Sequence, residues 1–175
     1  MKKLVLTTIV AMLMVPAMLA AQTATGTLTV NATVNSSINL VFNNDAAGVA
    51  LSSGAGTNTA TLNFGNVSAF GAVAAGITRS TTATTFTVST PVDVLVTKAN
   101  SASANYTLKA QLGAADAVNT WQVGGTTVTN AAQATITATG AYGSNVAEAI
   151  ALTVPFTTAN ATAISNTINF TATAN

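Results

Sequence analysis

Residues 26–42 alternate between apolar and polar side chains along their whole length. Even positions from Leu28 are apolar except Ser36, and odd positions from Thr27 to Asn39 carry Thr, Asn and Ser. The apolar set is Leu28, Val30, Ala32, Val34, Ile38, Leu40 and Phe42. An extended run of this length spans about 55 Å at roughly 3.3 Å per residue, whereas a typical strand has about 5–6 residues. The pattern therefore predicts more than one ordinary strand.

Three interpretations of this run remain open from the sequence. It is one strand that crosses between two sheets, or two strands separated near Asn35–Ser37, or a strand preceded by an extension over residues 22–35. In the third case, Leu28, Val30, Ala32 and Val34 contact a neighbouring subunit as an added strand. We favour a break near residues 35–37, where polar side chains interrupt the alternation.

Further alternating runs, rich in Thr, Val and Ile, follow at short intervals. We expect strands within residues 59–67, 84–89, 91–99, 104–112, 133–139, 145–157 and 166–174, and a two-residue hairpin at Gly124-Gly125 within 119–129. Pro155 favours an edge position or a bulge in its run. Together these runs predict an all-β fold, an Ig-like antiparallel β-sandwich of about 8–10 strands over residues 36–175.

The first 21 residues differ from the rest. Lys2 and Lys3 precede an apolar run that ends in the small residues of "AMLAAQ". This layout is typical of a secretory signal peptide cleaved near Ala20 or Ala21. We therefore expect a secreted, cell-surface or periplasmic protein with no membrane span after cleavage.

Charged residues make up only 5% of the chain, and there is no Cys. Removing residues 1–21 leaves three basic and four acidic residues, a formal charge of −1. Such a surface has little self-repulsion, so it favours contact with copies of itself or related subunits. It offers no basic patch for nucleic acid, and without Cys the protein cannot use disulfides.

The residues give little support to catalysis, a cofactor or a metal site. The chain has no His, and its acids are scattered. Asp93 and Glu148 lie in predicted strands and could meet across a sheet. Glu148 is in phase with Ile150, so we expect it at a strand end that opens to water. Asp45 follows two Asn residues, which favours a turn over a calcium site with a single carboxylate.

Trp121 is in phase with Val123, which favours the core over an exposed platform for a sugar ring.

"TLNFGNVSAFG" (61–71), "ALTVPFT" (151–157) and the two terminal alternating runs resemble exported bacterial fimbrial-type and spore-coat-U-like β-sandwich proteins. Leu62, Phe64 and Gly65 occupy the Leu-x-Phe-Gly pattern of that family. The chain differs in lacking the Cys pair of many such subunits, and its last run looks complete. The resemblance implies a non-enzymatic structural subunit of a surface fibre, pilus or coat. The alternative is a cell-envelope module that binds a glycan or another surface ligand.

Overall fold

The computed structural model describes residues 25–175. Its chain divides into two units, residues 25–33 in the first and Val34–Asn175 in the second. The described part of the first unit has no strand and no helix. The predicted signal peptide, residues 1–21, lies outside the described residues, as do residues 22–24.

The second unit consists of nine strands in two antiparallel sheets. The strands are β1 (Ser37–Asn43), β2 (Thr78–Thr81), β3 (Thr85–Ala99), β4 (Tyr106–Leu112), β5 (Thr120–Val123), β6 (Thr126–Val128), β7 (Ala134–Gly140), β8 (Asn145–Pro155) and β9 (Ile168–Ala174). The larger sheet has the order β1-β3-β8-β5-β6, with β2 also paired to β3, and the smaller has the order β7-β4-β9. This arrangement confirms the predicted all-β sandwich.

The long strand β3 joins two runs that the sequence suggested as separate. Its even residues from Phe86 to Val96 are all buried, so one alternation passes through the whole strand. Pro91 lies in the gap between the two strands that pair with the edge of β3 opposite β8. The pairing with β2 ends at Ser89, and the pairing with β1 ends at Asp93. The missing N–H of Pro91 is therefore tolerated in the middle of a long strand.

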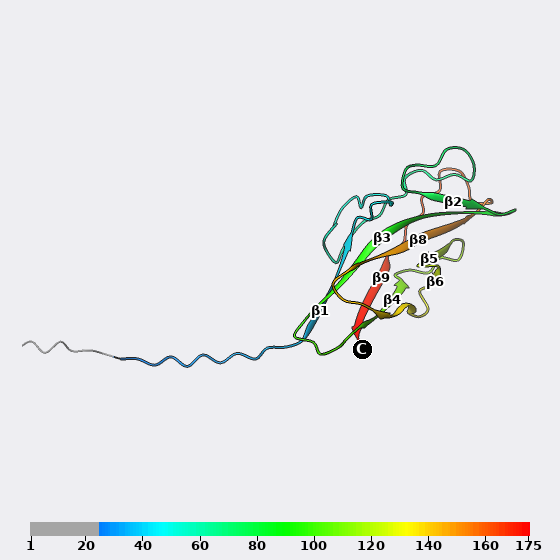
Figure 1. Ribbon diagram of the computed structural model, residues 1–175. Coiled ribbons are helices and arrows are strands. Elements are labelled where there is room, and N and C mark those ends of the chain that lie inside the picture. Colours follow the sequence, from blue (N-terminus) through cyan, green and yellow to red (C-terminus); the bar gives the residue numbers. More distant parts are fainter. Residues whose placement is uncertain (1–24) are drawn as a thin grey trace, which may run out of the picture. The chain divides into compact units, whose positions relative to one another are not determined.

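The hydrophobic core lies between the sheets. Side chains from β3 and β8 face Tyr106, Leu108, Ala110 and Leu112 of β4. Figure 1 shows β3 and β8 side by side, with β4 and β9 on one side of them. The alternating pattern specifies this arrangement, since every second residue of β4, and of β3 from Phe86 to Val96, is buried against the opposite sheet.

The hairpin prediction is confirmed. β5 and β6 pair antiparallel through Val123↔Thr126, and the turn is Gly124-Gly125. Both glycines have positive φ, +56° and +78°, which a two-residue hairpin turn of this type requires at both central positions.

The question raised by residues 26–42 has a partial answer. The strand begins at Ser37, and residues 25–36 have no strand. The strand boundary lies within the segment 35–37 where we expected a break, but residues 25–36 form no second strand before it.

The expectation of a strand over residues 59–67 is wrong. These residues form only an isolated bridge, Ser53↔Thr61, although Leu62 and Phe64 pack against the core. The edge position expected for Pro155 holds locally, since Pro155 pairs with Thr85 of β3 whereas the pairing of β8 with β5 ends at Thr153. Its missing N–H therefore interrupts no ladder on the β5 side.

Candidate functional site: an open apolar groove

A groove of about 1790 Å³ runs over the inner face of the larger sheet. Its floor is formed by alternate residues of β3 and β8, together with Trp121. The main floor residues are Phe86, Val92, Ile150, Leu152 and Val154. They point into the groove because they occupy the even-numbered positions of β3 and β8, whose side chains lie on the buried face of the sheet. The smaller sheet covers only part of this face, since it has three strands against six.

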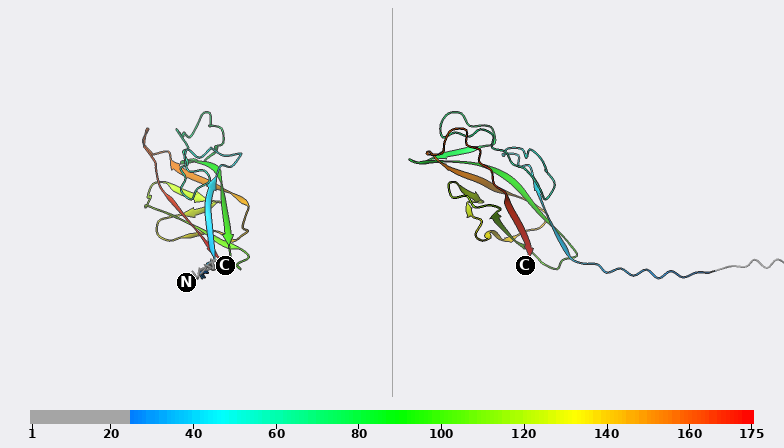
Figure 2. Two further views of the ribbon diagram at one scale, coloured as in Figure 1. Left: turned by 90° about the vertical axis from the view of Figure 1, so that its left-hand side faces the viewer. Right: turned by 180° about the vertical axis from the view of Figure 1, so that it is seen from behind.

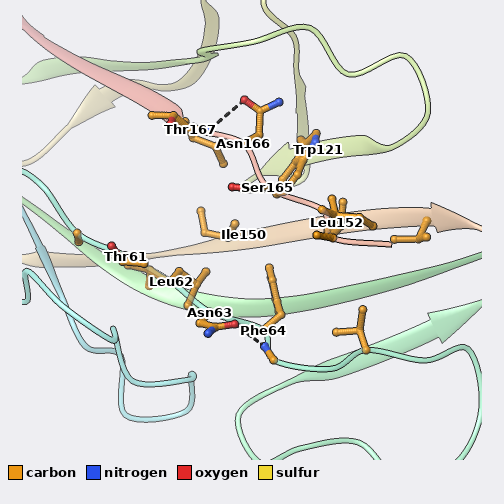
Figure 3. Close-up of a pocket in the computed structure, with 18 of the residues that line it drawn as sticks. Thr61, Leu62, Asn63, Phe64, Trp121, Ile150, Leu152, Ser165, Asn166 and Thr167 are labelled. Atoms are coloured by element: carbon orange, nitrogen blue, oxygen red, sulfur yellow. Dashed lines mark hydrogen bonds between the residues drawn. The ribbon is translucent and has the colours of Figure 1, made fainter. Parts of the chain in front are cut away.

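Two segments without strands form the walls, residues 58–70 and residues 156–167. Figure 3 shows Leu62 and Phe64 on one side and Ser165 to Thr167 on the other, with Ile150 between them. Among the described residues, the backbone groups of 164–166 make no hydrogen bond to other backbone groups. This wall therefore has free N–H and C=O groups, which an added strand can pair.

An aromatic pair lies at each end of the groove floor, one between β1 and β9 and one between the two walls. Phe42 of β1 contacts Phe170 of β9 edge-on, with ring centroids 5.2 Å apart. At the other end, Phe70 and Phe156 lie 5.8 Å apart, and Phe156 stacks over Phe86 at 6.4 Å. Along β3, these ends correspond to Phe86 and to Val94, the pairing partner of Phe42. Eight residue steps separate them, about 26 Å of strand.

One wall is held in place by Arg79 of β2. Its guanidinium donates hydrogen bonds to the carbonyls of Ser68 (2.9 Å) and Gly71 (2.7 Å). The loop that carries Phe70 is therefore fixed to the edge of the larger sheet.

The four residues predicted to contact a neighbouring subunit lie in an exposed stretch. Leu28, Val30 and Val34 are 86%, 78% and 72% exposed, and Ala32 is exposed as well. Large apolar side chains at regular alternate positions of a chain without strand pairing are uncommon on a monomer surface.

The structure does not bring together the two acids suggested as a pair. The β3–β8 register places Glu148 opposite Val92 and Asp93 opposite Ala147, so the two carboxylates lie on opposite faces of the sheet. Glu148 is buried at 6% exposure, and the expectation that it opens to water is wrong. It follows the strand parity into the core, where its Oε1 accepts a hydrogen bond from Thr137 at 3.3 Å. Burial raises the pKa of Glu148, and the hydrogen bond from Thr137 opposes this to a lesser extent.

Asp45 forms the expected turn, since its Oδ1 accepts a hydrogen bond from the backbone N–H of Ala47 at 2.7 Å. Asp93 accepts a hydrogen bond from Asn145, which itself accepts one from Asn43. Burial and the nearby carboxylate of Asp45 raise the pKa of Asp93. Among residues 25–175, no group of three or more acidic, His or Cys side chains could hold a metal ion.

Trp121 belongs to the core, as predicted, and is 7% exposed. Its Nε1 donates a hydrogen bond to the Asp116 carboxylate at 2.8 Å. Partial burial acts to raise the pKa of Asp116, but hydrogen bonds from Asn119, Trp121 and Val118 outweigh it and hold the pKa at about 2. Asp116 thus fixes the loop before β5 and the orientation of the Trp121 indole.

The sequence did not reveal the groove. The pattern predicts a strand around Leu62 and Phe64, and between the predicted strands 145–157 and 166–174 it predicts only a link over residues 158–165. Ile164 and Ile168 were the residues that could have indicated the groove, because they are apolar and lie within and directly after a polar loop.

Comparison of the chain with protein-family models, curated proteins and solved structures finds no match. In the described part of the chain, no helix has the length and apolar character to cross a membrane.

Proposed function

We propose that this protein is an exported structural subunit of a bacterial surface fibre, pilus or coat, and that it assembles through β-strand contacts. Residues 26–34 of one copy act as the added strand, and the apolar groove of another copy receives it. One observation carries the proposal: the chain combines an exposed, alternating apolar segment with an open apolar groove that has a free backbone edge.

The two parts match in length. Residues 26–34 span eight residue steps, about 26 Å when extended, and the floor between the aromatic ends of the groove spans the same number of steps along β3. Leu28, Val30, Ala32 and Val34 would face Ile150, Leu152 and the other floor residues, while the Thr and Asn residues between them face water. Full burial of each larger side chain contributes about 1.5–3 kcal/mol, before the cost of ordering the segment.

The low charge also supports assembly. Charged residues are 5% of the chain, so copies can approach closely without strong repulsion. Without Cys, a subunit gains no stability from disulfides, whereas strand addition both fills the groove and pairs its free edge.

Deletion of residues 22–34 tests the proposal. The full coding sequence is expressed, and the exported protein is followed by size-exclusion chromatography and electron microscopy over a range of concentrations. We expect polymers from the unaltered chain and a single monomer peak from the deletion.

Two substituted chains separate side-chain burial from length. Leu28→Ser with Val30→Ser should abolish assembly, whereas Thr27→Ser with Thr29→Ser, on the opposite face of the same strand, should leave it intact. If the deletion variant assembles like the unaltered chain, strand addition is wrong. If the unaltered chain is a monomer at every concentration, the structural role is wrong, and a cell-envelope binding module becomes the better interpretation.

A further inference from the structure

We infer that the end of the folded unit that carries Phe70 and Phe156 is a docking surface for the folded unit of a second copy, so that subunits add head to tail. This inference rests on the proposed function and adds to it the direction of the added strand and a second interface.

The direction follows from the edge that the groove exposes. β9 pairs with β4 on one side, and within the described residues no strand pairs with its other side. The groove lies along that free side, from Ile164 to Phe170. A strand added there becomes the fourth strand of the smaller sheet. Every strand pair in both sheets is antiparallel, and antiparallel pairing is slightly more stable per residue, so we assign the added strand antiparallel to β9.

This direction decides where the donor subunit lies. β9 runs away from the Phe70–Phe156 end and toward the C-terminus, which lies at the same end of the unit as the start of β1 (Figure 2). An antiparallel strand therefore enters at the C-terminal end, and its Val34 leaves beside Phe70 and Phe156. Only residues 35 and 36 separate Val34 from the first strand of its own folded unit. That folded unit must lie against this end of the acceptor.

The surface at this end fits such a contact. Phe70 is 73% exposed and Phe156 is 38% exposed, and their rings pack together at the rim of the groove. Exposed aromatic clusters of this kind are enriched at the centres of protein interfaces. The basic side chain nearby, Arg79, has its guanidinium engaged by the carbonyls of Ser68 and Gly71. The second copy would therefore meet an apolar surface held rigidly in place.

The opposite direction gives a different assembly. A parallel strand would leave at the end where the acceptor's own β1 begins, so that the donor unit would meet the point at which the acceptor's residues 35 and 36 enter their own folded unit. The antiparallel direction leaves one donating end and one accepting end on each subunit, which is the condition for an open, growing fibre.

Engineered cysteines test the direction, and the chain offers a cysteine-free background. Single-cysteine variants of the full chain are mixed in pairs, allowed to assemble and oxidised, and disulfide-linked dimers are measured on a non-reducing gel. We expect dimers from Thr33→Cys with Ser165→Cys and from Thr27→Cys with Thr171→Cys. The exchanged pairs, Thr33→Cys with Thr171→Cys and Thr27→Cys with Ser165→Cys, should give none.

Dimers from the exchanged pairs would overturn the antiparallel direction while leaving strand addition intact. Assembly without a dimer from any pair would overturn addition at the β9 edge. Absence of assembly by the unaltered chain would instead overturn the proposed function itself.

A second measurement tests the aromatic surface. Phe70→Ser should raise the concentration needed for half-maximal assembly by about tenfold, because it removes an aromatic contact from the interface. Val118→Ser, which changes a residue 61% exposed outside the groove lining, is the matched control and should have no effect. Equal effects of the two substitutions would refute the second interface, even if the expected disulfides form.

Discussion

Glu148 should destabilise the folded protein at neutral pH, and its replacement by Gln should therefore stabilise it. The side chain is 6% exposed between the sheets, and Thr137 donates its hydrogen bond at 3.3 Å, near the long limit. Its other oxygen lies against the hairpin turn, since a Cβ built on Gly124 would be 2.4 Å from Oε2. A carboxylate at this position has lost water without gaining a cationic partner among these contacts.

The direction of the pH effect follows from the raised pKa. Burial raises the pKa of Glu148 above its ordinary value of 4.5, so the folded state binds the proton more tightly than the unfolded state. The associated stability is fully present below about pH 4.5 and is lost as the pH rises through the folded-state pKa. Keeping an ionised carboxylate buried with a single weak hydrogen bond costs about 1–3 kcal/mol, so the destabilisation grows as the pH rises.

We expect Glu148→Gln to raise the free energy of unfolding by about 1–3 kcal/mol at pH 7 and by much less at pH 4. Urea unfolding followed by Trp121 fluorescence, at a concentration where the protein is monomeric, measures both values. Thr137→Val is the companion variant: it removes the one hydrogen bond to the carboxylate and should lower stability more at pH 7 than at pH 4. A loss of stability in Glu148→Gln that is equal at both pH values would refute this reasoning.

Two further predictions concern Asp116 and Gly140. Asp116→Ala should lower the free energy of unfolding by about 1–2 kcal/mol at pH 7, because the Trp121 indole loses its charged acceptor. The pKa of Asp116 is lowered from 3.8 to about 2, so this contribution is present above pH 3.8 and lost toward pH 2, where thermal unfolding should no longer distinguish variant from unaltered protein. Gly140→Ala should cost about 2–3 kcal/mol in urea unfolding, because the new Cβ would lie 2.3 Å from Cζ of the buried Tyr106 ring. Gly26→Ala, which meets no atom within 4 Å, is its control and should leave stability unchanged.

The sequence by itself determined the all-β class, most strands and the Gly124-Gly125 hairpin. These features depend on local physics: the alternation of side chains across a strand is read from neighbouring residues, and two glycines with positive φ form the turn wherever it lies. A break near the start of β1 was the interpretation that the sequence favoured for the same reason, since Ser36 interrupts the apolar face.

Only the tertiary structure decided which alternating runs find a partner. Residues 59–67 have the pattern of a strand but lie along a groove with free backbone groups, because a strand exists only where a neighbouring backbone completes its hydrogen bonds. Glu148 is buried for a similar reason. The register of β8 against β3 places Glu148 opposite Val92 on the core face of the sheet, although a charged side chain is better solvated on the outer face. Pairing between residues far apart in sequence therefore created the groove, and local pattern could not place its walls.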